Sequence, residues 1–361
     1  MKDGVAGGPL RVVPRVPLRV LVSRHTRHTH AATLDAATAG HAVQWVLLDG
    51  QDAGAPMPMP MPLSVPMPMP ADADVDVAFI SRDITGLSTK HEPQAMLQAC
   101  YAVLRASPRL AWVHAHSAGA DRPIYPELRT RGVTVTTSSG ANAQGVAATA
   151  LAGLLALSRR FPQLMVAQQQ CRWAPLVGAG PLPPDLAGQT LVLVGWGPIA
   201  QALHPHLVLL GLNVVVVRRS AVPAAPEVET VAATDLPKVL PRAQWLLLCC
   251  PLNDETRGLV DARALALLPA GAQLVNVSRG EVVVENALVA ALQSGHLAGA
   301  FLDVFEHEPL PASSALWSLP GVMVTPHIAG QSDGHAARVA AIFTANLRRF
   351  LQGQPLAHRV G

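Results

Sequence analysis

Residues 190–203 read TLVLVGWGPIAQAL, an apolar run that ends in two glycines and continues into a helix-forming segment. The apolar run predicts a buried parallel strand, which Gly195 and Gly197 follow directly. In a dinucleotide fingerprint the first glycine makes the tight turn, and the second lets a pyrophosphate approach the backbone at the helix N-terminus. Ala200 takes the third glycine position, where a small residue still allows close packing. The stretch therefore predicts the first βαβ unit of a Rossmann dinucleotide-binding domain.

Two prolines depart from this fingerprint. Pro198 suits the first turn of a helix, but it has no N–H group to offer a phosphate. Pro205 lies further along and predicts a kinked or shortened helix. Both prolines are expected to affect the affinity of the protein for the cofactor.

The residues that end the next apolar run, LNVVVVRRS at 212–220, are expected to decide whether NAD or NADP is bound. An acidic residue about 20 positions after the fingerprint would hold the ribose 2′-hydroxyl of NAD. This run instead ends in Arg218, Arg219 and Ser220. Arginine can bind the 2′-phosphate of NADP through charge-assisted bidentate bonds. The alternative is that the two arginines bind no cofactor and only end the strand in solvent.

Apolar runs recur along the chain with helix-length segments between them, which is a βαβ pattern. In residues 141–330, TLVLVG, LNVVVV, QWLLLCC, AQLVNV, GAFLDV and VMVTP predict a six-stranded Rossmann sheet, with a short extra strand possible near 228–231. In residues 1–140, LRVLVS, VQWVLL, DVAFIS, LAWVHA and GVTVTT predict a smaller doubly wound sheet. The predicted fold class is α/β with two doubly wound domains. A further helix is predicted in 333–353 from its periodicity.

Composition excludes several classes of protein. Half of the 361 residues are hydrophobic and 14% are charged, which suits buried parallel sheets and not disorder. A net charge of +3 without long basic runs predicts no nucleic-acid partner. The apolar stretch 146–157 falls short of the roughly 18 residues that span a bilayer, and the first residues lack a signal-peptide core, so we expect no membrane association and a cytoplasmic location.

The cysteines are expected to pack in the interior, and a proline-methionine repeat is expected to form a loop. Four cysteines are too few for a disulfide framework, and Cys249 and Cys250 end an apolar run in which packing is expected. The repeat PMPMPMPLSVPMPMP at 56–70 predicts an extended, solvated loop, because alternating prolines prevent helix and sheet pairing. We assign it no function, and we predict no metal site.

Three polar residues follow apolar runs late in the chain. Arg279 lies in AQLVNVSRGEVV, Glu308 in GAFLDVFEHEP and His327 in VMVTPHIAG. The carboxyl ends of parallel strands collect on one edge of a sheet, so these side chains are expected to converge. A guanidinium can bind a carboxylate at two points, an imidazole can exchange a proton near neutral pH, and a carboxylate beside it can orient it. The set suits redox chemistry on a small 2-oxo or 2-hydroxy acid.

The motifs NVSRGEVV, DVFEHEP and TPHIAG, in this order, resemble the signatures of the D-isomer-specific 2-hydroxyacid dehydrogenases, in the glyoxylate/hydroxypyruvate reductase part of that family. The resemblance covers most of the chain from about Val75. It implies that Arg279 binds and polarises the substrate, that His327 is the acid/base and that Glu308 is its partner. It also implies a flavodoxin-like substrate domain, 1–140, completed by a C-terminal helix in 331–361, and a homodimer.

Further site residues follow from the resemblance. Ala118 and Gly119 match a loop whose backbone N–H groups bind the substrate carboxylate, although a steric role for the glycine is the alternative. Ser81 and Arg82 either line the pocket or lie in a solvated loop. Asp303 either contacts the nicotinamide or is a structural hydrogen-bonding group. The expected cofactor-binding residues are Gly195, Gly197, Pro198, Ile199, Arg218, Arg219, Ser220, Cys250, Pro251, Val277, Asp303, His327 and Gly330.

The sequence thus predicts hydride transfer between NADP(H) and a short 2-oxo or 2-hydroxy acid such as glyoxylate or hydroxypyruvate. The resemblance to NADPH-linked reductases favours NADP, with NAD possible. One alternative is an NAD-dependent phosphoglycerate-type dehydrogenase, which the arginine pair disfavours. The other is a dinucleotide-sensing module of the corepressor kind, which resembles the same family.

Overall fold

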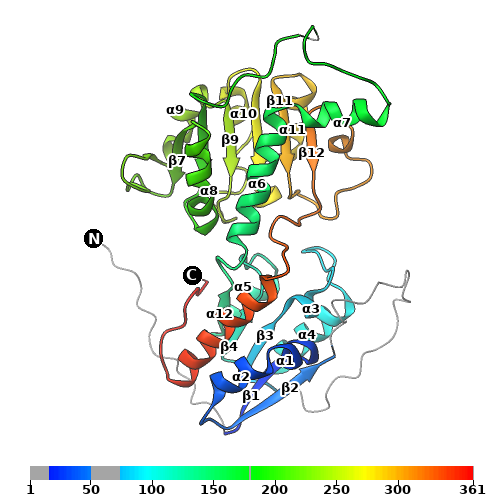
Figure 1. The fold of residues 1–361 in the computed structure, drawn as a ribbon. Helices are drawn as coiled ribbons and strands as arrows, with labels where there is room; N and C mark the ends of the chain where they lie inside the picture. Colours follow the sequence, from blue (N-terminus) through cyan, green and yellow to red (C-terminus); the bar gives the residue numbers. More distant parts are fainter. Residues whose placement is uncertain (1–15, 50–73, 179, 361) are drawn as a thin grey trace. The chain divides into compact units, whose positions relative to one another are not determined.

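The computed structural model describes residues 16–49, 74–178 and 180–360, so the predicted loop at 56–70 lies outside the described residues. The chain forms two compact units (Figure 1). Unit 1 comprises Met1–Ala141 and Asp333–Gly361, and unit 2 comprises Asn142–Ser332. These divisions lie beside the boundaries expected at 140 and 330.

Unit 1 is a parallel five-stranded sheet in the order β2-β1-β3-β4-β5, with helices on both faces. Its strands are β1 (Leu18–Ser23), β2 (Val43–Leu48), β3 (Val77–Ile80), β4 (Trp112–Ala115) and β5 (Thr134–Thr137). Its helices are α1 (Arg24–Thr29), α2 (Ala31–Thr38), α3 (Arg82–Thr85), α4 (Ala95–Ala106), α5 (Ile124–Thr130) and α12 (His335–Leu351).

Alternating strand residues divide the core of unit 1 between the two faces of the sheet. Side chains of α4 and α5 pack on one face, and those of α2 and α12 pack on the other. Helix α12 carries much of the second core, because Trp112 stacks on Phe343 and Phe350 with ring centroids 5.3 and 5.6 Å apart. The last helix therefore belongs to the same core as the first strand.

Unit 2 is a parallel seven-stranded sheet in the order β12-β11-β10-β9-β6-β7-β8 (Figure 1). The strands are β6 (Thr190–Val194), β7 (Asn213–Arg218), β8 (Glu229–Ala232), β9 (Trp245–Leu248), β10 (Ala272–Asn276), β11 (Leu297–Leu302) and β12 (Val322–Val324). The α-helices are α6 (Ala143–Ser158), α7 (Phe161–Gln169), α8 (Pro198–Leu209), α9 (Leu236–Val239), α10 (Ala262–Leu267) and α11 (Glu285–Gln293). Short 3₁₀ turns are η1 (Ala233–Asp235), η2 (Leu240–Arg242), η3 (Gly280–Val282) and η4 (Ala315–Trp317).

Both sheets have the predicted strands, and β8 is the short extra strand expected near 228–231. Helices α6 and α8 pack on one face of the unit 2 sheet, and α9, α10 and α11 pack on the other. The predicted fold class, two parallel α/β domains, is confirmed.

The strand order of unit 2 reverses between β6 and β9, where a doubly wound sheet forms its ligand crevice. Gly195 lies there with φ 105°, a left-handed conformation that favours glycine. A β-carbon on Gly195 would also lie 2.9 Å from the Cα of Cys250. The loops after β6 and β9 therefore meet closely, and only glycine fits between them.

Pro205 does not end its helix. Helix α8 runs on to Leu209, so the expected shortening is wrong, whereas the alternative, a kink at Pro205, stays a prediction. Leu203 and Leu207, on either side of Pro205, are fully buried against the sheet. Burial of this apolar face outweighs the hydrogen bond that a proline removes from the helix.

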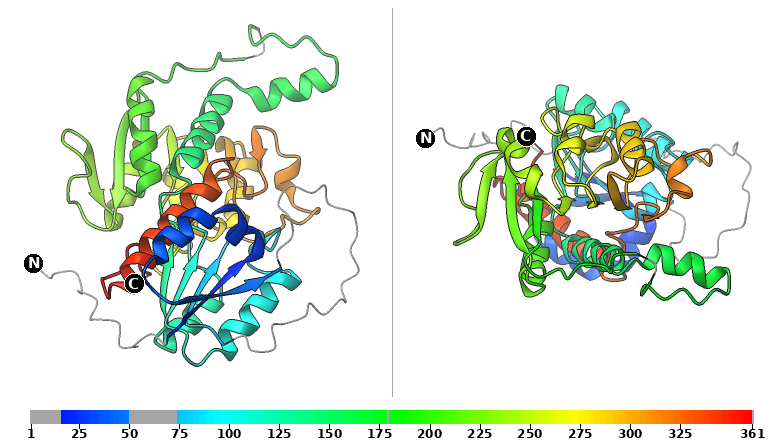
Figure 2. Two further views of the ribbon diagram at one scale, coloured as in Figure 1. Left: turned by 60° about the horizontal axis from the view of Figure 1, so that its bottom comes forward. Right: turned by 90° about the horizontal axis from the view of Figure 1, so that it is seen from above.

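Helix α7 and the segment after it extend outward from unit 2 (Figure 2). In α7 the side chains of Phe161, Met165 and Val166 are about half exposed, and Trp173, in the segment after the helix, is 94% exposed. No helix in the described ranges is long and apolar enough to cross a bilayer.

The cysteines are free thiols. Cys249 and Cys250 are buried, as expected from their position at the end of an apolar run. Burial raises the pKa of the Cys250 thiol to about 11, so this residue is present as the unreactive thiol near neutral pH.

Candidate active site

The loop that carries Arg279 is held firmly at the carboxyl end of β10. The Asn276 carboxamide accepts hydrogen bonds from the backbone N–H and hydroxyl of Ser278 at 3.0 and 2.6 Å, and donates one to the Arg279 carbonyl at 3.1 Å. Gly280 follows, and a β-carbon there would lie 1.8 Å from the carbonyl carbon of Phe305. The Arg279 loop therefore packs directly against the loop after β11.

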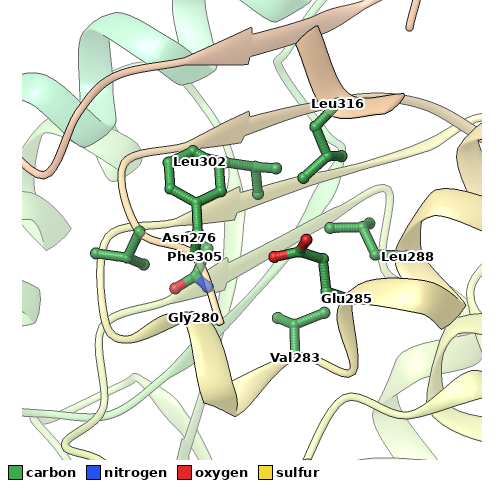
Figure 3. A pocket seen from close by; sticks show the side chains of 9 residues that line it. Asn276, Gly280, Val283, Glu285, Leu288, Leu302, Phe305 and Leu316 are labelled. Atoms are coloured by element: carbon green, nitrogen blue, oxygen red, sulfur yellow. The ribbon is translucent and has the colours of Figure 1, made fainter. Parts of the chain in front are cut away.

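A small pocket lies beside this loop (Figure 3). It has room for about one water molecule. The Glu285 carboxylate borders it and accepts a hydrogen bond from the backbone N–H of Glu306 at 3.2 Å. Burial raises the pKa of Glu285 above its ordinary value. The size and the mostly apolar lining of this pocket exclude it as a substrate site; its lining residues are Asn276, Gly280, Val283, Glu285, Leu288, Leu302, Val304, Phe305 and Leu316.

His327 and Glu308 form a hydrogen-bonded pair. Nδ1 of His327 lies 2.8 Å from Oε2 of Glu308, whose other oxygen accepts from the Phe305 N–H at 3.1 Å. The His327 side chain is 44% exposed and that of Glu308 is 20% exposed. Burial would raise the pKa of Glu308, but the bond to His327, the charges of His327 and Arg279, and the Phe305 N–H together lower it.

The three predicted polar residues therefore converge within unit 2. Glu308 contacts His327 directly, and Arg279 is close enough for its charge to act on Glu308. This arrangement places a cation near an imidazole that a carboxylate orients. The pairing through Nδ1 leaves Nε2 as the ring atom to exchange a proton with a ligand.

Asp303 holds the loop that carries His327. Its carboxylate accepts from the Thr325 hydroxyl at 2.7 Å and from the N–H groups of Ile328 and Ala329 at 2.9 and 3.0 Å. Its carbonyl accepts from the N–H of His327, which has φ 53°. Asp303 thus makes structural hydrogen bonds, and its contact with the nicotinamide stays a prediction. Burial outweighs these bonds and raises the pKa of its carboxyl.

The fingerprint loop after β6 suits a dinucleotide. Gly197 caps α8, and nothing lies within 4 Å of where its β-carbon would be, so a phosphate can approach the backbone there. Pro198 is the first residue of α8, which leaves the N–H groups of Ile199 and the following residues for an anion. The residues present therefore fit a pyrophosphate. Among the described residues, no cluster of three or more His, Cys, Asp or Glu side chains suits a metal ion.

Arg218 ends β7, and Arg219 and Ser220 follow it on the surface. Nε of Arg219 lies 3.7 Å from the Glu255 carboxylate, and both side chains are largely exposed. An exposed pair of this kind contributes about 0–1 kcal/mol, so a ligand phosphate can displace Glu255 at little cost.

The other predicted residues lie at strand ends. Cys250 and Pro251 follow β9, and Val277 follows β10. Gly330 lies close to Asn142, because a β-carbon on this glycine would lie 2.6 Å from the Asn142 amide. In unit 1, Ala118 and Gly119 follow β4, and the Ser117 hydroxyl donates to the Gly119 carbonyl at 2.7 Å. Sequence reasoning missed Asn276 and Thr325, although each is a polar residue at or just after the end of a strand.

Comparison with known proteins agrees with this geometry. Residues 151–329 match the family model for the NAD-binding domain of D-isomer-specific 2-hydroxyacid dehydrogenases. Glyoxylate/hydroxypyruvate reductase B of Citrobacter koseri is 34% identical over 255 residues, which cover 70% of this chain and 78% of that protein. The chain belongs to the D-2-hydroxyacid dehydrogenase family.

Solved structures of this family extend the similarity to both units. The D-isomer-specific 2-hydroxyacid dehydrogenase of Xanthobacter autotrophicus Py2, in complex with NADPH and MES, is 30% identical, with a TM-score of 0.70 and coverage of 96% and 98% of the two chains. The NADPH-dependent glyoxylate/hydroxypyruvate reductase of Sinorhizobium meliloti, in complex with NADP and malonate, is 26% identical, with a TM-score of 0.69 and coverage of 96% and 97%. This D-2-hydroxyacid dehydrogenase is therefore an oxidoreductase that acts on CH–OH groups and binds a nicotinamide cofactor.

Proposed function

We propose that this enzyme reduces a short 2-oxo acid, such as glyoxylate or hydroxypyruvate, with NADPH. The observation that supports this most is the 2.8 Å pair of His327 and Glu308, with the charge of Arg279 beside it. His327 is the proton donor, Glu308 orients it, and Arg279 is the cation that binds the substrate carboxylate.

In this mechanism the bound cofactor supplies the hydride, and the protein supplies position and charge. Arg279 and the backbone N–H groups of Ala118 and Gly119 bind the substrate carboxylate. His327 donates a proton from Nε2 to the developing alkoxide, which it also stabilises electrostatically. Glu308 orients the ring through the bond to Nδ1. In the reverse direction, neutral His327 removes the hydroxyl proton.

Consumption of NADPH with a panel of 2-oxo acids tests the proposal. We expect turnover with glyoxylate and hydroxypyruvate and slower turnover with NADH. A protein that binds NADPH but reduces no 2-oxo acid would instead be a sensing module, which no feature of the described residues favours.

The preference for NADPH is proposed from Arg218 and Arg219. Neutralising both, as Arg218→Gln with Arg219→Gln, should weaken NADPH binding but leave NADH binding largely unchanged, because only NADPH carries the 2′-phosphate. Each lost charged hydrogen bond should cost about 1.5–3 kcal/mol. Dissociation constants for both cofactors measure this effect, with Arg263→Gln on the surface of α10 as a control for the loss of a positive charge elsewhere in unit 2. Equal losses for the two cofactors would contradict the assignment.

The coupling of Glu308 to His327 predicts a change in pH dependence. The bond to His327 and the charge of that ring lower the pKa of Glu308, so the carboxylate beside the ring is negatively charged near neutral pH. Glu308→Gln removes this charge, so the alkaline limit of glyoxylate reduction should move to lower pH. The measurement is kcat/KM against pH at saturating NADPH, with Glu306→Gln as the control. An unchanged alkaline limit would show that the pair is not coupled in catalysis.

We also propose a homodimer in the cytoplasm. The exposed apolar residues of α7 and the segment after it, including Phe161 and Trp173, support a partner surface on unit 2. The partner is a second copy of the chain, as the family resemblance implies. A solution mass that corresponds to a single chain would contradict the dimer.

A further inference from the structure

The loop that carries Glu308, here called the acid loop (303–308), is attached to the start of helix α11 by the side chain of Glu285. Oε2 of Glu285 accepts a hydrogen bond from the backbone N–H of Glu306 at 3.2 Å. Glu285 is the first residue of α11, and its carboxylate points into the small pocket that residues of α11 and of the acid loop line (Figure 3). The mechanism proposed above does not use this carboxylate.

The start of α11 is a fixed point in unit 2. Leu288 and Leu292 of this helix are buried in the core against the sheet. The N–H of Val284, the residue before the helix, donates to the Val260 carbonyl at 3.0 Å. Glu285 therefore approaches the acid loop from a rigid element, and its hydrogen bond positions the loop.

The hydrogen bond reaches the peptide group at which the acid loop meets the loop that carries Arg279. A β-carbon on Gly280 would lie 2.0 Å from the Phe305 carbonyl oxygen and 2.3 Å from the Glu306 nitrogen, so this peptide packs directly on the glycine. Glu285 accepts the N–H of the same peptide. Gly280 thus limits how far the peptide can move, and Glu285 fixes the direction of its N–H group.

Phe305 connects this peptide to the pair of Glu308 and His327. The N–H of Phe305 donates to Oε1 of Glu308 at 3.1 Å, and Oε2 of Glu308 lies 2.8 Å from Nδ1 of His327. Glu306 and His307 are exposed, so burial of their side chains does not hold this part of the loop. Rotation of the Phe305–Glu306 peptide would turn Phe305 and displace the N–H group that orients Glu308.

We propose that Glu285 is a positioning residue for the reaction: by accepting the N–H of Glu306, it sets the place of Glu308 beside His327. The inference rests on the proposed function, in which Glu308 orients His327, and adds the residue that positions Glu308.

The acceptor oxygen of Glu285 and its reach matter here, and its charge does not. Burial raises the pKa of its carboxyl, and so does the charge of Glu306, whereas the Glu306 N–H and the charge of His307 lower it. A neutral amide oxygen accepts an N–H hydrogen bond as a carboxylate oxygen does. Glutamine at this position should therefore serve, and a shorter acid should not.

The test compares Glu285→Gln, which keeps the reach without the charge, with Glu285→Asp, which keeps the charge without the reach. Glu285→Gln should retain most of kcat/KM for glyoxylate. Glu285→Asp should lose about 5-fold or more, and its alkaline limit should move to lower pH as in Glu308→Gln. If Glu285 only placed a negative charge at the start of α11, aspartate would be the better replacement and the order would be reversed. Asn286→Ala, at the exposed next position of α11, is the control.

A double-mutant cycle tests whether Glu285 acts through Glu308. In a Glu308→Ala background, Glu285→Asp should cause little further loss of kcat/KM, because the side chain that Glu285 positions is gone. Equal losses in the two backgrounds, or the reversed order of the two Glu285 variants, would overturn the proposal.

Proton NMR gives a second measurement that does not need turnover. The hydrogen-bonded Nδ1 proton of His327 should give a downfield signal, which its loss in His327→Gln assigns. The signal should remain in Glu285→Gln and weaken or disappear in Glu285→Asp, whereas an unchanged signal in Glu285→Asp would contradict the positioning role. If no 2-oxo acid is reduced but the signal changes in this way, the proposed reaction fails while the positioning of Glu308 by Glu285 stands.

Discussion

His327→Gln is expected to lose about 10²–10⁴-fold in kcat/KM for glyoxylate while the fold and NADPH affinity are retained. Glutamine keeps a polar side chain of similar reach, but it cannot deliver a proton to the alkoxide. The loop should persist, because Asp303 holds it through the Thr325 hydroxyl and the N–H groups of Ile328 and Ala329.

Steady-state kinetics and NADPH titration measure this loss. His206→Gln, at an exposed position of α8, is the control, and it should retain full activity. A His327 variant with more than about a tenth of the wild-type rate would place the acid/base elsewhere.

Arg279→Lys is expected to be nearly as damaging, with a loss of about 10²-fold or more in kcat/KM. Lysine keeps the charge, but it cannot form the planar two-point contact with a carboxylate. A misplaced substrate also loses its alignment with the hydride donor. NADPH affinity should change little, because the fingerprint and the arginine pair lie after β6 and β7, whereas Arg279 follows β10.

The same kinetic measurements, with Arg263→Lys as the control, separate a substrate role from a structural one. Melting temperature should stay close to the wild-type value, because Asn276 and Gly280 shape the loop through contacts that this change preserves. Near-normal kcat/KM in a folded Arg279 variant would show that another group binds the carboxylate.

The sequence predicted the strands well because strands of buried parallel sheets are continuous apolar runs. TLVLVG and QWLLLCC became β6 and β9, with the glycine turn between the strand and α8 as expected. Pro205 was interpreted from local propensity alone, and packing of Leu203 and Leu207 overrode it. Local rules fail where tertiary contacts carry most of the free energy.

Contacts across strands were beyond prediction from sequence. Asp303 reaches Thr325 because β11 and β12 pair with Leu302 opposite Val324, and this register cannot be read from either run alone. Sequence identifies which residues end the strands, whereas register determines which of them meet.

The insertion of unit 2 between the two parts of unit 1 has a consequence for biosynthesis. A ribosome releases the residues of unit 2 before it releases α12, so the Rossmann core can form while unit 1 is still incomplete. Until then, the sheet surface around Trp112 lacks Phe343 and Phe350 and exposes apolar side chains to solvent. The part of the protein that is made first thus finishes folding last, and chaperone contacts during synthesis should concentrate on the β1, β3 and β4 strands.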